Sequence, residues 1–468
     1  MLDTNAEKTK YTGMYILYNT ILFATMFIIL PYFLLKMAFT GKYRKSLVQK
    51  LGGRQTQILT DLGDGPRVWV HAVSVGEVMA AAPIVAFLKM KRPEIMIIFS
   101  TSTETGQQMA QQLVKDADAF IYFPLDIPYV VRKIIRLAKP AVFVMVETEL
   151  WPNFLKACKL NSVKTLMVNG RLSPRSYKKY RLTMYFWRRV LADLCAAGMI
   201  AEVDAARMKS IGMAKDRVEV LGNAKYDALA AMAAPALQEE IARRVNVQEG
   251  ERFFVAGSTH QGEEEIVIRV YQQLLNHYAD FKLIIVPRHV ERTAVIMELL
   301  QSAGLPDVIT MTDMNNGKIR EKERIIIIDV IGELFKIYSL ATIVYCGGSL
   351  VHKGGQNILE AAAWGKVIFY GPSMEDFSEE KVLLEEVGCG VTISNEEELL
   401  QAILQVLEHP DELEKRGARG KAVVAANMGA AVRYAEMINR VIGGRGKGIR
   451  LKAEGGKTKG DRLKTEGD

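Results

Sequence analysis

The chain has 468 residues, of which 49% are hydrophobic and 24% charged, a length that corresponds to about two or three domains. With 37 glycines and 14 prolines, the composition excludes wholesale disorder and fibrous repeats. The four cysteines form no C-x-x-C pair, which argues against a disulfide framework or a structural zinc site and favours a reducing compartment. The net charge of +8 by itself excludes no class of protein, because the charge is unevenly distributed along the chain.

Half of the excess charge lies at the C-terminus. Residues 441–468 contain eight Lys or Arg, four Asp or Glu and eight glycines. This composition predicts a disordered basic tail over 442–468. Such a tail can contact anionic lipid or nucleic acid, but a solvated terminus is the simpler interpretation and the one we favour.

A long uncharged run precedes the folded body. No charged residue occurs in 11–35, and at about 1.5 Å per residue a helix of this length spans a hydrocarbon core of about 30 Å. Six basic residues follow before the first acid, Asp61, so the positive-inside rule places the remaining chain in the cytoplasm. We therefore expect 1–60 to hold an N-terminal membrane anchor helix, single-pass or monotopic, and a basic juxtamembrane segment. A cleaved signal peptide and a buried core helix are the alternatives.

Short apolar runs alternate with helical stretches after residue 66. Runs at 68–70, 95–99, 141–146 and 165–168 lack polar alternation, as in strands buried on both faces of a parallel sheet. The same rhythm restarts with runs at 253–256, 283–286, 325–328, 342–345 and 367–369. An alanine-rich stretch at 228–247 lies between the two sets and can hold a hinge. The sequence thus predicts two doubly wound, Rossmann-like α/β domains at 61–230 and 231–441, with a cleft between them.

In such sheets ligands bind beyond the carboxyl ends of the strands, so the loops there are candidate sites. Ser74, Gly76 and Glu77 follow the first predicted strand. Ser74 can cap the next helix, and Glu77 can either stabilise the helix N-terminus or act as a general base. Thr101 and Thr103 follow the second strand, where hydroxyl groups can cap a helix or contact a phosphate.

Two acids and an arginine follow the next two strands. Glu147 and Glu149 end a strongly apolar run, where a carboxylate is costly unless it is paired or faces a site. They can also simply lie near the helix that Pro152 begins. Arg171 follows the run at 165–168 and can contact a phosphate.

The second predicted domain carries three comparable loops. Arg288, after Pro287, is a candidate phosphate clamp, although a surface ion pair is the usual role of an arginine. A second loop contains Ile331, Gly332 and Glu333. The third has two double glycines and then Asn357, which is expected to cap a helix with Glu360 in its first turn. Backbone N–H groups at that helix start can hold a phosphate, and the Glu360 carboxylate can reach ribose hydroxyls.

Several site classes are excluded by motif. The sequence has no Walker A motif, no G-x-G-x-x-G loop, no G-x-S-x-G elbow and no metal-ligand spacing. A phosphate-and-ribose loop in the second domain and acids in the first favour a transferase. The second domain would bind a nucleotide-activated donor and the first an acceptor.

Six segments, in this order and spacing, resemble the 3-deoxy-D-manno-octulosonic acid (Kdo) transferases over about residues 11–441. They are Ser74-Val-Gly-Glu77, Glu147-Thr-Glu-Leu-Trp-Pro152, Asn169-Gly-Arg171, Pro287-Arg288, Gly332-Glu333 and Gly347-Gly-Ser…Gly354-Gly-Gln-Asn-Ile-Leu-Glu360. The resemblance implies the GT-B fold of two facing Rossmann-like domains. It also implies inverting, metal-independent transfer of Kdo from CMP-Kdo to a lipid A precursor (lipid IVA) at the cytoplasmic face of the inner membrane.

The resemblance also implies roles for individual residues. Glu77 would be the general base and Glu147 a second acid near the acceptor. CMP would be held by Pro287, Arg288, Ile331, Gly332, Glu333, Asn357, Ile358, Leu359 and Glu360. The acceptor would be contacted by Ser74, Gly76, Thr101, Thr103 and Arg171. Gln356 departs from the family, which commonly has His there. The expected partners are the two substrates and membrane lipid, with no cofactor and no nucleic acid.

Two other readings are compatible with these motifs. One is a different GT-B enzyme, such as a UDP-sugar glycosyltransferase or a sugar-nucleotide epimerase. The other is a membrane-tethered, non-catalytic nucleotide-sugar binding module, against which the presence of both Glu77 and Arg288 argues.

Overall fold

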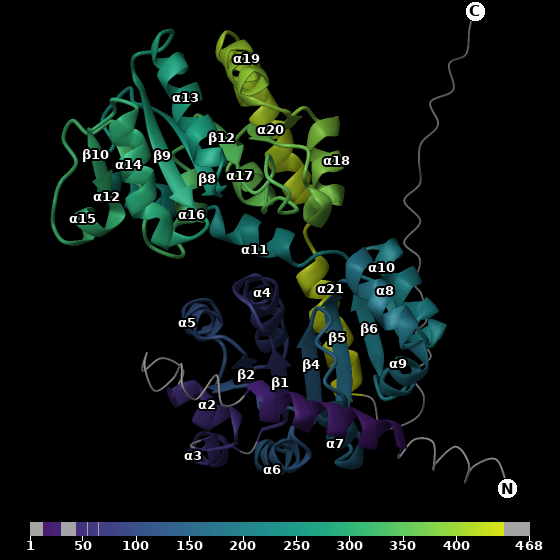
Figure 1. The fold of residues 1–468 in the computed structure, drawn as a ribbon. Helices are drawn as coiled ribbons and strands as arrows, with labels where there is room; N and C mark the ends of the chain where they lie inside the picture. The colour runs from purple at the N-terminus through teal and green to yellow at the C-terminus, as the bar shows by residue number, and fades with distance from the viewer. Residues whose placement is uncertain (1–12, 30–43, 54, 64, 444–468) are drawn as a thin grey trace, which may run out of the picture. The chain divides into compact units, whose positions relative to one another are not determined.

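The computed structural model describes residues 13–29, 44–53, 55–63 and 65–443 (Figure 1). The described residues fall into two compact units. Unit 1 takes those up to Val78, Val85–Leu221 and those from Arg433 onward, and unit 2 takes Met79–Ile84 and Gly222–Val432. Each unit is built around one seven-stranded sheet.

The sheet of unit 1 has the order β3-β2-β1-β4-β5-β6-β7, and every pair of neighbours is parallel. Its central strands are buried along their whole length, as the unbroken apolar runs predict. The strands are β1 (Arg67–His71), β2 (Met96–Thr101), β3 (Ala119–Tyr122), β4 (Val142–Val146), β5 (Lys164–Gly170), β6 (Ala196–Met199) and β7 (Val218–Val220).

Helices connect these strands and cover the sheet. After a helix at 13–29 they are α2 (Arg44–Lys50), α3 (Gln55–Thr60), α4 (Val75–Lys91), α5 (Glu104–Leu113), α6 (Pro128–Ala138), α7 (Pro152–Leu160), α8 (Pro174–Leu182), α9 (Met184–Leu191), α10 (Glu202–Ser210) and the short η1 (Lys215–Arg217). Pro152 begins α7, as the sequence predicts, because proline at the first helical position loses no intrahelical hydrogen bond.

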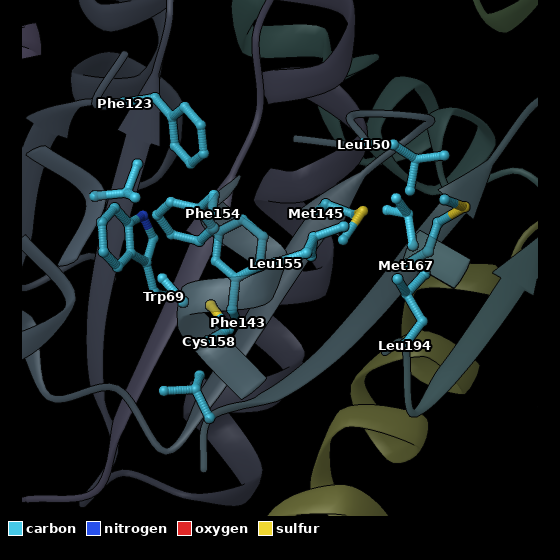
Figure 2. Packing of buried hydrophobic residues seen from close by; sticks show 14 of the residues in the cluster. Trp69, Phe123, Phe143, Met145, Leu150, Phe154, Leu155, Cys158, Met167 and Leu194 are labelled. Atoms are coloured by element: carbon cyan, nitrogen blue, oxygen red, sulfur yellow. The ribbon is translucent and has the colours of Figure 1, made fainter. Parts of the chain in front are cut away.

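An aromatic cluster fixes β1, β4 and α7 to one another (Figure 2). The fully buried Trp69 ring meets the rings of Phe143 and Phe154 edge-on, with centroids 5.9 and 5.2 Å away. Its indole nitrogen is satisfied too, donating to the Ser100 hydroxyl at 2.8 Å. This packing holds the loops after β1 and β4 at defined positions.

The sheet of unit 2 has the order β10-β11-β9-β8-β12-β13-β14, again with all neighbours parallel. Apolar clusters lie on both of its faces, with Phe253 and Ile284 in one and Phe254 and Leu283 in the other. The strands are β8 (Arg252–Thr259), β9 (Phe281–Pro287), β10 (Val308–Thr310), β11 (Ile325–Ile327), β12 (Ile343–Cys346), β13 (Ile368–Tyr370) and β14 (Gly390–Thr392).

The helical segments of unit 2 begin with α11 (Lys225–Met232) and α12 (Pro235–Val245), which form the alanine-rich stretch. They continue with α13 (Glu263–Leu275), η2 (Val290–Arg292), α14 (Thr293–Ser302), α15 (Met311–Asn315), α16 (Leu334–Tyr338), α17 (Leu359–Ala363), η3 (Glu375–Phe377), α18 (Ser378–Glu386), α19 (Glu396–Leu407) and α20 (Pro410–Ala426). The two doubly wound parallel sheets that the sequence predicts are thus both present.

The unit boundaries differ from the predicted ranges 61–230 and 231–441, because the last helix, α21 (Ala430–Gly443), crosses back to the first sheet. Its Tyr434 packs over Gly198 of β6, where a Cβ would lie 2.6 Å from the ring. Arg433 donates to the Leu221 carbonyl at 2.8 Å, and Arg440 pairs with Glu219 of β7 at 3.0 Å. The missing side chain at Gly198 therefore makes the room for a helix that the sequence places in the second domain.

The N-terminal helix 13–29 lies within the predicted anchor and is drawn in purple in Figure 1. Its Tyr18 hydroxyl donates to Asp126 at 2.9 Å, and Asn19 and Asn153 exchange amide hydrogen bonds at 3.2 and 2.7 Å. No helix within the described residues combines the length and the apolar character needed to cross a membrane, so the expected spanning helix is not found there. The rest of the predicted anchor, 1–12 and 30–43, and the tail from 444 lie outside the described residues.

Candidate active site

The strand order reverses between β1 and β4 in unit 1, and between β8 and β12 in unit 2. At such a switch point the loops leave in opposite directions and expose backbone and side chains at the carboxyl edge of the sheet. The loops that follow β1, β4 and β12 carry half of the predicted site residues, and the other half lie at the ends of β2, β5, β9 and β11 or just after them. Each unit therefore has its own candidate ligand-binding edge.

Glu77 follows β1 and lies in the first turn of α4, with 7% of its surface exposed. Its carboxylate accepts the Val73 N–H at 2.7 Å and the Ser74 hydroxyl at 3.0 Å. Burial, reinforced by the negative charge of Glu147, raises the pKa of Glu77 to about 7, and the two hydrogen bonds oppose this rise. A carboxylate with this pKa can accept a proton near neutral pH.

Glu147 and Glu149 follow β4, the strand next to β1. Glu147 adopts a left-handed conformation (φ 60°), and its N–H donates to the Val168 carbonyl at 2.9 Å. Glu149 accepts the Trp151 indole N–H at 3.1 Å, and burial raises its pKa to about 7. The charges of both acids raise the pKa of Glu77. The structure thus brings the three predicted acids into one electrostatic group.

Two of the three hydroxyl residues around this group act as helix caps. Ser74 and Thr103 cap α4 and α5, and Thr103 also donates to the Val73 carbonyl at 3.2 Å. Thr101 is fully buried, and its hydroxyl bonds Gln107 at 2.6 Å. The structure thus shows the capping role for Ser74 and Thr103, while Thr101 caps no helix. Gly76 lies in the first turn of α4, and half-buried Arg171 contributes positive charge near Asp204.

In unit 2, Pro287 ends β9 and Arg288 begins the following loop. The Arg288 backbone N–H donates to the Thr259 carbonyl at 2.9 Å, which ties this loop to the end of β8. The Arg288 side chain is exposed, and its guanidinium makes no hydrogen bond or ion pair with any residue that the structure describes. An arginine held in this way is available to an anionic ligand.

Asn357 and Glu360 lie together after β12. The Asn357 amide donates to the Glu360 carboxylate at 3.1 Å, and its oxygen accepts the Leu359 N–H at 3.3 Å. Burial raises the pKa of Glu360 to about 7, while Asn357 and the charges of Arg288 and Lys225 lower it. The N-cap position of α17 is Ile358, so Asn357 lies one residue earlier than predicted, although its side chain does accept the N–H of the first helical residue. Glu360 lies in the first turn, as predicted. The Ile358 and Leu359 side chains are buried in the core, so these residues can offer a ligand only backbone groups.

In the second predicted loop, Ile331 to Glu333, the carboxylate is already engaged by two cations. Gly332 has φ 95° and Ile331 is 72% exposed. The Glu333 carboxylate is engaged by Arg244 at 2.8 Å and by Lys336 at 3.5 Å. Its charge is therefore already paired within unit 2.

Residues that the sequence interpretation did not single out follow β8. Ser258 has φ 54°, and the Thr259 hydroxyl is buried without a hydrogen-bond partner among the described residues. The His260 ring bonds the Ser258 carbonyl at 3.1 Å and meets the His289 ring edge-on at 5.9 Å. The polar run that closes this apolar strand is the same signal that identified Glu77, and could have revealed them. No group of three or more His, Cys, Asp or Glu side chains in the described parts of the chain could hold a metal ion.

Two doubly wound units with polar groups at both switch points have the GT-B type architecture. Sequence comparisons specify the family. Residues 43–228 match the family model of 3-deoxy-D-manno-octulosonic-acid transferase (kdotransferase). A 3-deoxy-D-manno-octulosonic acid transferase from Haemophilus influenzae is 30% identical over 79% of this chain and 86% of its own. The chain belongs to the Kdo transferase family.

Two further comparisons concern a longer relative and the fold. A bifunctional glycosyltransferase/methyltransferase from Fusobacterium nucleatum is 33% identical over 80% of this chain, which spans 58% of that relative's length. A glycosyltransferase structure from Rickettsia africae, 16% identical, matches the fold with a TM-score of 0.53 over 81% of this chain and 99% of its own.

Proposed function

We propose that this Kdo transferase moves Kdo from CMP-Kdo to a lipid A precursor such as lipid IVA, with inversion and without a metal ion. The single observation that carries the catalytic part of the proposal is Glu77. Its buried carboxylate has a pKa of about 7 and lies beside two further acids, Glu147 and Glu149. This is the environment of a general base that works at neutral pH.

In the proposed reaction, Glu77 removes the proton from an acceptor hydroxyl as that oxygen attacks the anomeric carbon of Kdo. The bond from this carbon to the CMP phosphate breaks, and CMP leaves with the bonding electrons. One such displacement inverts the anomeric centre and needs only one base. Glu147 would lie near the acceptor and keep the Glu77 pKa high.

The donor part of the proposal rests on unit 2. Negative charge grows on the departing phosphate, and the Arg288 guanidinium would stabilise it. A carboxylate such as Glu360, held by Asn357, can accept hydrogen bonds from ribose hydroxyls. Pro287, Ile331, Gly332 and Glu333 would complete the CMP site, and Ile358 and Leu359 would contribute backbone groups.

We also propose that unit 1 contacts the cytoplasmic face of the inner membrane. Helix 13–29 turns Tyr15, Tyr18 and Asn19 to the body of the unit, while Phe27 and Ile28 are 84% and 75% exposed. The Phe186 ring of α9 contacts both Tyr15 and Tyr18 (centroids 6.2 and 5.9 Å away), so the α8–α9 pair lies beside this helix.

The α8–α9 pair has the composition of a lipid-facing surface. Leu182 and Tyr185 are 88% and 66% exposed, among the exposed basic residues Arg175, Lys178, Lys179, Arg181 and Arg188. Apolar side chains flanked by cations favour an anionic bilayer interface, and the same cations can bind the phosphates of a lipid acceptor.

The reaction class is tested by mass spectrometry of the lipid formed from CMP-Kdo and a defined lipid A precursor. We expect the precursor mass to increase by one or more Kdo residues, to the same extent with and without EDTA. Absence of a Kdo-bearing lipid would contradict the proposal. Transfer from a UDP-sugar instead would support the other GT-B reading, and no turnover with retained CMP binding would support a non-catalytic module.

A further inference from the structure

One buried carboxylate in unit 2, that of Glu263, binds the backbone of a loop that is distant from it in the sequence. Glu263, the first residue of α13, is completely buried. One of its oxygens accepts the N–H groups of Ser349 and Leu350 at 3.1 and 3.0 Å and the Tyr345 hydroxyl at 2.8 Å. The other accepts the N–H groups of Gly348 and His260 at 2.7 and 2.9 Å.

These contacts assign a structural role to the loop that begins with the first double glycine, Gly347-Gly348. Three consecutive N–H groups, from Gly348 to Leu350, converge on one point, as they do where a loop binds a phosphate. Here an internal carboxylate occupies that point. The N–H groups are therefore already used, and the donor phosphate must be bound by other groups, such as the exposed Arg288 guanidinium.

The loop that Glu263 holds leads directly to donor-site residues. The Gly348 carbonyl accepts the Gly355 N–H at 3.0 Å, and Gly355 lies two residues before Asn357. The Ser349 hydroxyl accepts the Gly371 N–H at 2.8 Å, and its carbonyl accepts the Ser373 N–H at 3.0 Å. Displacement of Gly348 and Ser349 would therefore move the segment that carries Asn357 and Glu360.

We propose that Glu263 is a positioning residue of the donor site. Its carboxylate replaces an anion in the Gly348–Leu350 loop and thereby fixes Asn357 and Glu360 in the orientation that binds the nucleotide. This inference rests on the proposed function, since it assigns the donor to unit 2.

Glu263→Gln tests the proposal with almost no change in volume. Wherever the amide nitrogen lies, it meets two N–H donors, so at least two hydrogen bonds to a charged group are lost, and one or both of them come from the Gly348–Leu350 loop. We expect the donor KM for CMP-Kdo, and the Kd for CMP measured by calorimetry, to rise at least about tenfold. The acceptor KM should stay unchanged. A purely structural role would instead lower kcat through loss of folded enzyme and leave both KM values unchanged.

Glu265→Gln is the matched control, because this acid lies in the same helical turn and its carboxylate bonds the Gly262 N–H at 3.1 Å. Its donor KM should equal that of the wild type. If Glu263→Gln does not fold, Tyr345→Phe removes one hydrogen bond to the same carboxylate and should raise the donor KM about threefold. An unchanged donor KM in the folded Glu263→Gln variant, or in Tyr345→Phe when that variant replaces it, would overturn the inference. Wild-type enzyme that transfers no Kdo would instead overturn the proposed function.

Discussion

Glu77 combines the hydrogen bonds of a helix cap with a raised pKa. Its carboxylate accepts hydrogen bonds from Val73 and Ser74 at the start of α4, which is what a first-turn acid does in many helices. Burial and the nearby acids nevertheless raise its pKa to about 7. The two interpretations that the sequence leaves open for Glu77 are therefore compatible, and in the proposed reaction the capping hydrogen bonds would orient the base.

The pKa of Glu77 predicts the pH dependence of the reaction. A base must be deprotonated to accept a proton, so kcat/KM should rise with pH and level off above about 7. Glu147→Gln removes a negative charge that raises this pKa, so the rising limb should move to lower pH, whatever happens to the maximum rate. The ratio of kcat/KM at pH 6 to that at pH 8 measures the shift.

Glu104→Gln is a suitable control for this experiment. Glu104 begins α5 in the same unit but is not among the groups that shift the Glu77 pKa. Its pH profile should match that of the wild type. A Glu147→Gln profile identical to the wild-type profile would show that Glu77 is not the titrating base.

Single residues could be predicted where they follow a strongly apolar strand. Glu77, Glu147 and Arg288 were all found in this way, because parallel strands end at one edge of the sheet. The pairing of Glu333 could not be predicted, since Arg244 lies 89 positions away in the sequence. The same limit applies to Glu263, whose partners come from another loop.

At the scale of elements, the apolar runs predicted the inner strands except β6, and they predicted none of the four edge strands. The predicted runs correspond to β1, β2, β4, β5, β8, β9, β11, β12 and β13. The others, β3, β6, β7, β10 and β14, lie at or next to a sheet edge and have three or four residues each. The β6 sequence Ala-Ala-Gly-Met has little β propensity, because Gly198 serves the packing of α21 instead.

The first turn of α13 shows a similar limit. Three successive acids there fit the general preference for negative charge at a helix N-terminus. In the structure they differ: Glu263 holds the Gly348–Leu350 loop, while Glu264 forms two hydrogen bonds of 3.1 Å with Arg292 in the loop after β9. One helix start thus supports two loops that carry proposed donor-site residues.

Helix 13–29 carries a prediction at this scale. Replacing Ile21, Phe27 and Ile28 together with Ser should weaken binding to anionic phospholipid vesicles by more than about tenfold, since each buried apolar side chain contributes about 1.5–3 kcal/mol. Vesicle co-sedimentation measures the effect. The contacts of Tyr18 and Asn19 with unit 1 are untouched, so the helix should stay docked.

Ile319→Ser provides the comparison, because this side chain is 69% exposed but belongs to unit 2. Its vesicle binding should not change. Equal binding by the wild type and the triple variant would contradict the proposed membrane contact.

At the scale of the whole molecule, the proposed reaction uses groups from both units. The predicted pair of doubly wound domains is present, and the proposed chemistry assigns the base to unit 1 and the nucleotide to unit 2. The return of α21 to the first sheet was not predictable, because its partners there lie more than 200 positions away in the sequence. Gly198 and the contacts of Arg433 and Arg440 are among the features that hold it there.

The central claim is that Glu77 supplies the base without taking part in nucleotide binding. The most direct test measures two quantities on one variant, Glu77→Gln: Kdo transfer to a lipid A precursor and CMP affinity by calorimetry. The account predicts that kcat falls by at least about 100-fold while the Kd for CMP stays at the wild-type value. Kdo transfer by Glu77→Gln at the wild-type rate would contradict it.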